Sequence, residues 1–162
     1  MIVGIGVDLV DIPRFESTIM RTPRLRDRLF TEHERGLPLR SLAARYAAKE
    51  ALIKALGGSD GVTWTEIEVA RLGEREAPRF ELTGATAQTV ASLGITALHL
   101  SLSHDAGLAI AYVTAEGEAG PAAVDVVSAG VESPLDEADG DEADGSDVAD
   151  GAGTSTAGET TP

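Results

Sequence analysis

The sequence of 162 residues contains no cysteine, which excludes disulfide bonds and thiolate metal sites. It has no apolar run approaching the roughly 18 residues of a membrane-spanning helix. Its first segment, MIVGIGVDLVD, lacks the basic region of a signal peptide. Phosphate-binding loops of the Walker type, zinc-binding H-E-x-x-H motifs and G-x-S-x-G nucleophile elbows are also absent. We therefore expect a cytoplasmic protein with no membrane partner.

Positive charge is missing from the C-terminal part of the chain. Residues 116–162 contain no lysine, arginine or aromatic residue, and they carry thirteen of the 27 acidic residues, some in the short repeat DEADGDEADG. Such a composition cannot bury enough apolar surface to offset the entropy of ordering the chain. All but one unit of the net charge of −14 therefore belongs to this segment. We interpret 1–115 as one folded domain and 116–162 as an acidic, low-complexity, disordered tail.

Lysine is scarce, because only Lys49 and Lys54 are lysines among thirteen basic residues, and both lie in the segment RYAAKEALIKALGG. Ten of the thirteen basic residues fall between Arg14 and Lys54, against five acidic ones. This local excess of positive charge suits an anionic partner such as a phosphate, a nucleic acid or an acidic protein. A solvated, arginine-rich surface explains the charge equally well.

The hydrophobic pattern predicts an α+β fold. A buried strand is expected at 2–9, and a helix at 13–21 begins after Asp11, a good N-cap. The alanine- and leucine-rich segment 39–56, ended by two glycines, predicts the longest helix. The remaining elements are a short helix near 24–30, strands at 64–72 and 79–83, a helix at 84–94, and a hairpin of strands at 97–104 and 107–115. Their order predicts an antiparallel sheet packed against one long helix and shorter helices.

Two isolated polar residues stand at the ends of predicted strands. Asp8 ends an apolar strand, where an unpaired carboxylate is costly, so it needs a cation, a metal or solvent. It could equally cap the following turn. His104 precedes the turn at 105–107, and a lone histidine is more often structural than catalytic.

The long predicted helix carries Arg45, Lys49, Glu50 and Lys54 at i, i+4 spacings. On an exposed helix these would be two ordinary spacings, and only the Glu50–Lys54 ion pair would stabilise the helix, by about 0.3–0.5 kcal/mol. Their neighbours, however, are alanine, leucine and isoleucine, which indicates a mostly buried helix with one polar stripe facing a cleft. A carboxylate between two cations on such a stripe suits Mg²⁺ together with phosphate groups.

Three motifs, GIGVDLVDIPRF, RYAAKEALIKALGG and LSLSHDAGLAIAYV, together resemble the holo-acyl-carrier-protein synthases, the small class of 4′-phosphopantetheinyl transferases. The resemblance covers residues 1 to about 115. It implies transfer of 4′-phosphopantetheine from coenzyme A to a serine of apo acyl carrier protein. Adenosine 3′,5′-bisphosphate would be released, and the reaction would serve fatty acid biosynthesis.

The resemblance also implies roles for individual residues. It makes Asp8 and Glu50 the Mg²⁺ ligands and, with Lys54 at the pyrophosphate, the catalytic set. The implied coenzyme A contacts are Arg45, Lys49, Lys54, Ser103 and His104. Arg14 would contact the acidic carrier protein, and charge adds Arg21, Arg24 and Arg28 to that surface. The family forms homotrimers with active sites between subunits, so Asp8 and Glu50 could come from facing chains.

Some features depart from the family pattern. Asp8-Leu9-Val10 lacks the second acid of the D-x-E motif found in larger relatives, Ala44 replaces a common glycine, and Ala77 precedes Pro78 where Gly-Pro turns are usual. The acidic tail lies outside the pattern and could compete with the carrier protein, although a solubility appendage is the simpler interpretation. The alternative function is a non-catalytic module that binds an acidic protein or a nucleotide. We expect no nucleic acid partner.

Overall fold

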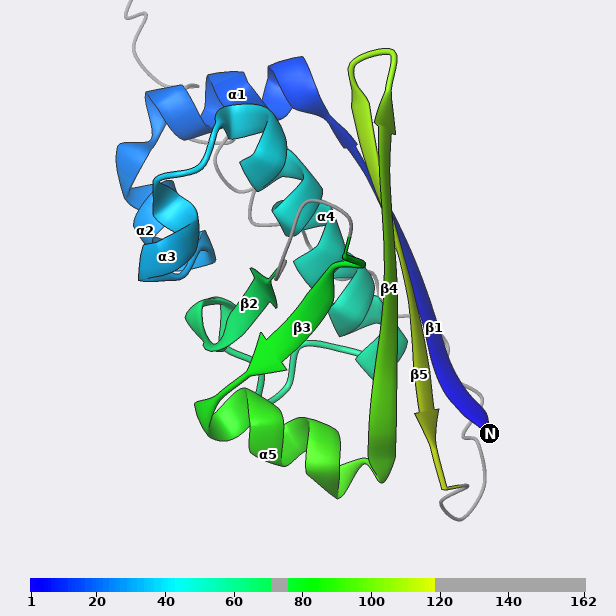
Figure 1. The fold of residues 1–162 in the computed structure, drawn as a ribbon. Coiled ribbons are helices and arrows are strands. Elements are labelled where there is room, and N and C mark those ends of the chain that lie inside the picture. The colour runs from blue at the N-terminus through cyan, green and yellow to red at the C-terminus, as the bar shows by residue number, and fades with distance from the viewer. Residues whose placement is uncertain (71–75, 119–162) are drawn as a thin grey trace, which may run out of the picture.

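The computed structural model describes residues 1–70 and 76–118, which contain both strands and helices (Figure 1). The elements are β1 (Ile2–Asp11), α1 (Ile12–Arg21), α2 (Pro23–Leu29), α3 (Glu32–Arg35), α4 (Leu39–Leu56), the 3₁₀ helix η1 (Trp64–Glu66), β2 (Ile67–Ala70), β3 (Arg79–Leu82), α5 (Gly84–Ser92), β4 (Ile95–Asp105) and β5 (Leu108–Gly117).

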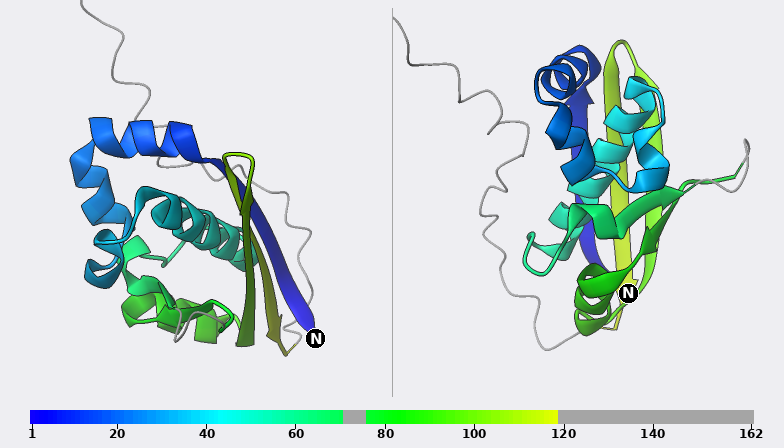
Figure 2. Two further views of the ribbon diagram at one scale, coloured as in Figure 1. Left: turned by 45° about the horizontal axis from the view of Figure 1, so that its top comes forward. Right: turned by 90° about the vertical axis from the view of Figure 1, so that its left-hand side faces the viewer.

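The main sheet is antiparallel, with the strand order β1-β5-β4, and β2 and β3 form a separate two-stranded antiparallel sheet. The long helix α4 packs across β1 and β5. Figure 2 shows that the helices all lie on one side of the three-stranded sheet. The predicted α+β class, with an antiparallel sheet packed on one long helix, is confirmed. No helix within the described ranges is both long and apolar enough to cross a bilayer.

Two glycines in β1 allow the strand to lie directly on α4. A Cβ atom at Gly4 would clash with the carbonyl oxygen of Ala55, and one at Gly6 would clash with that of Ala51. The sequence GIG is therefore a contact between two backbones and not a fragment of a phosphate loop. Because side chains alternate along a strand, Asp8 follows Gly4 and Gly6 on the face toward α4.

The opposite face of the main sheet is apolar and exposed in the single chain. Leu9 of β1 is 59% exposed and Tyr112 of β5 is 46% exposed. Other exposed apolar residues of these two strands are Ile2, Val3, Ile5, Val7, Leu108 and Ile110. The prediction of a buried strand at 2–9 is thus wrong for a single chain, because alternate side chains point away from α4 and none of the described residues covers them.

The helix caps form as the chemistry of their residues predicts. Asp11 caps α1 by accepting a hydrogen bond from the backbone N–H of Arg14 at 2.9 Å, and Thr31 forms a capping box with Glu34. Gly57 ends α4 in a left-handed conformation. The predicted strand at 64–72 begins later than expected, because Trp64–Glu66 forms η1 before β2 begins, and its last two residues, 71 and 72, lie outside the described residues.

The last strand of the fold extends two residues beyond 115, the predicted end of the domain. β5 continues to Gly117, whose N–H donates to the carbonyl oxygen of Met1 at 2.9 Å. The N–H of Glu118 donates to the carbonyl oxygen of Gly94 at 3.2 Å. The rest of the predicted tail, residues 119–162, lies outside the described residues.

Candidate functional site

Asp8 and Lys54 form an ion pair where β1 crosses α4. The Lys54 ammonium donates to Asp8 Oδ1 at 2.7 Å and to the carbonyl oxygen of Val7 at 3.3 Å. The pair is open to solvent, since the Lys54 side chain is 41% exposed and that of Asp8 is 13% exposed. Asp8 thus has a cation as partner, and it does not cap the following turn, where Asp11 is the cap.

Glu50 lies one helical turn before Lys54 and is buried. The Tyr46 hydroxyl lies 3.3 Å from Glu50 Oε1 and donates to it. Tyr46, Glu50 and Lys54 therefore follow one stripe of α4, and the Lys54 end of that stripe meets Asp8. Asp8 contacts this stripe of α4 within its own chain, through Lys54.

The donor set of this stripe suits a cation that needs few protein ligands. No group of three or more histidine and acidic side chains gathers among the described residues, so no closed metal cage is formed there. Mg²⁺ commonly takes one or two carboxylates and fills its other positions with water and substrate phosphate. The carboxylates of Asp8 and Glu50 fit that requirement, with the ammonium of Lys54 beside them.

Lys49 lies on a different side of α4 and is fully buried. Its ammonium donates to Glu34 Oε2 at 2.6 Å and to the carbonyl oxygens of Leu29 at 2.8 Å and Trp64 at 3.2 Å. An ammonium has three N–H donors, so all three have acceptors inside the protein. The prediction that Lys49 contacts a coenzyme A phosphate is contradicted by this arrangement.

Burial lowers the pKa of Lys49, because removal from water disfavours the charged form, while the carboxylate of Glu34 opposes this effect. The ammonium also lies 5.2 Å from the centre of the Phe30 ring. Neighbouring aromatic rings complete the surroundings, since Tyr46 stacks on Trp64 with 5.3 Å between ring centres. Lys49 is therefore a structural cation that joins α4 to α2, α3 and η1.

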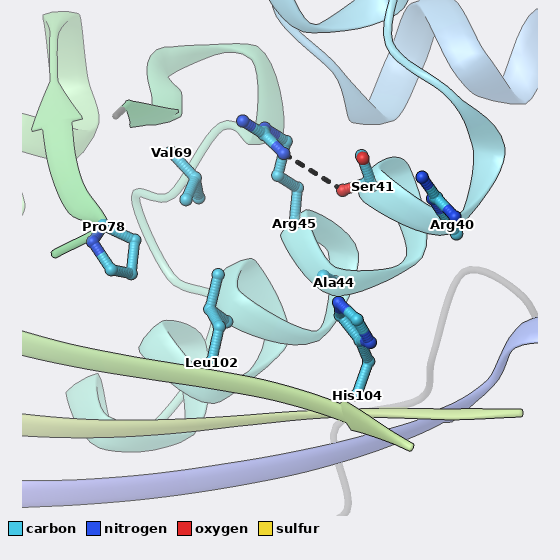
Figure 3. A pocket seen from close by; sticks show the side chains of 8 residues that line it. All are labelled: Arg40, Ser41, Ala44, Arg45, Val69, Pro78, Leu102 and His104. Carbon is cyan, nitrogen blue, oxygen red and sulfur yellow. Dashed lines mark hydrogen bonds between the residues drawn. The ribbon is translucent and has the colours of Figure 1, made fainter. Parts of the chain in front are cut away.

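A cavity of about 180 Å³ opens between α4 and the sheets (Figure 3). Arg45 lines one wall, where its guanidinium donates to the Ser41 carbonyl oxygen at 3.2 Å. His104 and Leu102 of β4 lie across from it, and the remaining lining residues are Arg40, Ser41, Ala44, Val69 and Pro78. The structure thus brings Arg45 and His104 together, as predicted, and adds Arg40, which sequence reasoning treated only as part of the basic segment.

Ser103 lies on the other face of the sheet from this cavity. Leu102 and His104 line the cavity, so the residue between them on the strand points to the opposite face. That face is the exposed apolar face described above, where Ser103 is paired with Ile110 of β5. A single chain therefore does not place Ser103 beside His104 in one pocket.

The four arginines predicted to contact a carrier protein lie on α1 and α2. Arg14, Arg21, Arg24 and Arg28 are all exposed. Met20 lies among them on α1 and is also exposed. The two helices thus present a basic surface with an apolar residue in it.

Glu34 is the residue that sequence reasoning missed. Its side chain is 2% exposed and accepts hydrogen bonds from three donors. One signal was available, because the apolar surroundings of Lys49 predict burial and a buried lysine requires a carboxylate. The pattern does not say which acid that is, since Glu34 lies fifteen residues away in another helix.

Comparison with known proteins agrees with this geometry. Residues 4–113 match the family described as the 4′-phosphopantetheinyl transferase superfamily. A holo-acyl-carrier-protein synthase of Clavibacter michiganensis subsp. michiganensis is 58% identical over 119 residues, which are 74% of this chain and 99% of the relative.

Solved structures give the same result. The holo-acyl-carrier-protein synthase of Neisseria meningitidis superposes with a TM-score of 0.66 at 30% identity, over 72% of this chain and 99% of that chain. The holo-acyl-carrier-protein synthase of Helicobacter pylori, in complex with coenzyme A, superposes with a TM-score of 0.61 at 31% identity, over 69% of this chain and 99% of that chain. The resemblance drawn from the three motifs is confirmed. The chain therefore belongs to the 4′-phosphopantetheinyl transferase superfamily and, within it, to the holo-acyl-carrier-protein synthases.

Proposed function

We propose that this chain transfers 4′-phosphopantetheine from coenzyme A to a serine of apo acyl carrier protein, in fatty acid biosynthesis in the cytoplasm. The serine oxygen forms a bond to the phosphorus that bears pantetheine. The bond from that phosphorus to the bridging oxygen of the pyrophosphate breaks, and adenosine 3′,5′-bisphosphate leaves. The observation that carries the proposal is the Asp8–Lys54 pair, one helical turn from Glu50, within the segment that matches the family.

The reaction requires the enzyme to neutralise charge and to align two substrates, because the carrier serine supplies the nucleophile. Asp8 and Glu50 are the residues that would hold Mg²⁺, which when bound withdraws negative charge from the phosphates. The ammonium of Lys54, which is accessible to solvent, is placed to contact the pyrophosphate and to stabilise charge on the leaving group. No activated serine or cysteine is needed on the enzyme.

The cavity beside α4 suits the phosphate end of coenzyme A. Arg45 and Arg40 supply guanidinium groups and His104 supplies a ring N–H, all of which bind phosphate oxygens well. At about 180 Å³ the cavity is smaller than the roughly 300–1,000 Å³ of pockets that enclose whole ligands. One chain would thus hold only part of coenzyme A in this cavity.

A homotrimer accounts for the remainder of the site and for the exposed apolar face. Antiparallel sheets usually place polar residues on their solvent face, and an apolar face of this size indicates a covered surface. A second copy of this chain is the occupant we propose, because active sites between subunits would bring Ser103 of the covered face to a neighbouring chain's cavity. The prediction of Ser103 as a coenzyme A contact is retained only in this form.

The exposed arginines of α1 and α2 provide the surface for the carrier protein. Carrier proteins are acidic, so Arg14, Arg21, Arg24 and Arg28 would attract one and orient its serine toward the Lys54 end of α4. Such exposed charges act mainly on the association rate, and their effect weakens as salt rises.

A mass-shift assay tests the proposed activity. The full chain is incubated with apo acyl carrier protein, coenzyme A and Mg²⁺, and the carrier is examined for the mass gain of one phosphopantetheine. We expect a complete gain that is lost on chelation of Mg²⁺ and in Glu50→Gln. No gain with a folded chain, tested on free carrier proteins and on carrier domains of large synthases, would leave the alternative of a non-catalytic binding module. That module predicts that Glu50→Gln leaves carrier binding intact.

A further inference from the structure

Two oxygen atoms of one buried carboxylate link the protein core to the cavity wall. Glu34 Oε2 accepts from the Lys49 ammonium at 2.6 Å and from the backbone N–H of Thr31 at 3.1 Å. Glu34 Oε1 accepts from the backbone N–H of Val69 at 2.9 Å and lies 3.8 Å from Arg45 Nε. One oxygen is therefore held by the core, and the other faces two residues that line the cavity.

We propose that Glu34 is a positioning residue for the reaction, which holds the guanidinium of Arg45 and the backbone of β2 as two walls of the substrate cavity. Arg45 and Val69 both line that cavity, although they come from different elements, and Glu34 contacts both. This inference rests on the proposed function, because it takes the cavity as the site of a coenzyme A phosphate.

The chemistry of the contacts requires a carboxylate at this position. All four groups that face Glu34 present N–H donors, from Lys49, Thr31, Val69 and Arg45. A glutamine has one acceptor oxygen and an NH₂ group, so one pair of donors would face another donor. An aspartate keeps the charge but is shorter by one methylene, so it cannot reach both sides at the same distances.

Lys49 gives Glu34 its fixed position. An isolated carboxylate so deeply buried would be protonated or would move toward water. The ammonium of Lys49 compensates its charge and is itself fixed by the carbonyl oxygens of Leu29 and Trp64. Lys49 therefore fixes the position of Glu34, and Glu34 in turn fixes the position of Arg45. Of these three residues, only Arg45 lines the cavity.

The test is a thermodynamic cycle on ligand binding without a carrier protein. Glu34→Gln alone would leave Lys49 charged and unpaired in the core, so the variant used is the double substitution Glu34→Gln with Lys49→Met, which removes both charges. Dissociation constants for coenzyme A and for adenosine 3′,5′-bisphosphate are measured by calorimetry. We expect both ligands to bind about tenfold more weakly, a coupling of ordinary size for residues in contact.

Arg45→Gln is then made in the wild-type chain and in the double variant. If Glu34 acts through Arg45, the third substitution weakens binding much less in the double variant than in the wild-type chain. In turnover assays of the double variant the KM for coenzyme A should rise, with a smaller change in kcat. Val113→Ala, a buried substitution in β5 outside the cavity, is the matched control and should leave both dissociation constants unchanged.

Equal effects of Arg45→Gln in the two backgrounds, or wild-type affinity in the double variant, would overturn the inference. If the double variant fails to fold, Glu34→Asp takes its place in the same cycle, with the same two outcomes. A chain that binds coenzyme A but transfers nothing to the carrier disproves the proposed function, whereas the coupling between Glu34 and Arg45 still decides this inference. A wild-type chain that binds neither ligand overturns both.

Discussion

The two lysines of α4 make ion pairs of nearly equal length in opposite surroundings. Lys49 lies 2.6 Å from Glu34 with both side chains buried, and Lys54 lies 2.7 Å from Asp8 with the Lys54 side chain open to solvent and that of Asp8 partly exposed. Lys54 is five positions after Lys49, so the two lysines point to different sides of the helix. The separation of charges within a pair therefore says little about its role, and its exposure to water says much more.

Exposure decides what each ammonium can do. A buried pair repays its desolvation only while both partners remain, so Lys49 is fixed and its removal is costly. An exposed pair contributes little to stability, typically about 0.2–1 kcal/mol, and its charges can be shared with a ligand. The buried pair thus belongs to the framework, and the open pair is available to substrate.

Lys49→Met is expected to have the largest effect on stability. It leaves the Glu34 carboxylate buried without its cation, and we expect a loss of about 3–5 kcal/mol in the free energy of unfolding. Urea unfolding followed by fluorescence measures this, because the single tryptophan, Trp64, stacks on Tyr46 close to Lys49. Chain concentration must be held constant if the protein is oligomeric. A loss below about 1 kcal/mol in the free energy of unfolding would mean that the buried pair stabilises the fold no more than the exposed pair does.

Lys54→Met is expected to show the reverse pattern. The free energy of unfolding should change by less than about 1 kcal/mol, since the pair it removes is exposed. The value of kcat/KM for the carrier should fall about a hundredfold, the usual size for loss of one charge-stabilising group. The mass-shift assay gives the rate, and urea unfolding of the same sample gives the control. Nearly normal turnover would show that the open pair has no part in the reaction.

Lys54→Arg sharpens the comparison because it keeps the charge. We expect about a tenfold fall in turnover, since the planar guanidinium cannot take the position of a compact ammonium between the Asp8 carboxylate and the Val7 carbonyl oxygen. The matched substitution Lys49→Arg should instead destabilise the fold, because the buried position lacks room for the larger group. Full activity in Lys54→Arg would mean that charge alone suffices at this position.

Local signals in the sequence predicted most of the fold. The Asp11 cap and the glycine that ends α4 act over a few residues, so their partners are visible in the sequence. The exposed face of β1 was predicted wrongly for the opposite reason. A continuous apolar run indicates burial on both faces, but the sequence does not say whether the second face is covered by the same chain.

The motifs placed both lysines of α4 in one site, whereas the structure pairs Lys54 with Asp8 and buries Lys49 against Glu34. The resemblance assigned both Lys49 and Lys54 to phosphate groups of coenzyme A. Separating them required the position of Glu34, which reaches Lys49 from another helix across fifteen residues of sequence. A contact of that kind depends on how the helices pack, and no spacing rule within α4 reveals it.

The acidic segment 119–162 is expected to have the smallest effect. Its residues lie outside those described, and the Clavibacter relative is matched over 99% of its own length by 74% of this chain. We expect truncation after Glu118 to leave kcat and the KM for carrier within about twofold, as for a solubility appendage. The cut follows Glu118 rather than residue 116 because Gly117 and Glu118 are hydrogen-bonded to the sheet.

Salt dependence distinguishes the alternative role of that segment. If its acidic residues competed with the carrier for the arginines of α1 and α2, truncation would lower the KM for carrier at low ionic strength. The difference would disappear near 0.5 M salt, where the screening length falls to roughly 4 Å. The full-length chain measured at both salt concentrations is the control. A fall in the KM for carrier on truncation, seen only at low salt, would show that the acidic segment regulates access of the carrier to the open Lys54 pair.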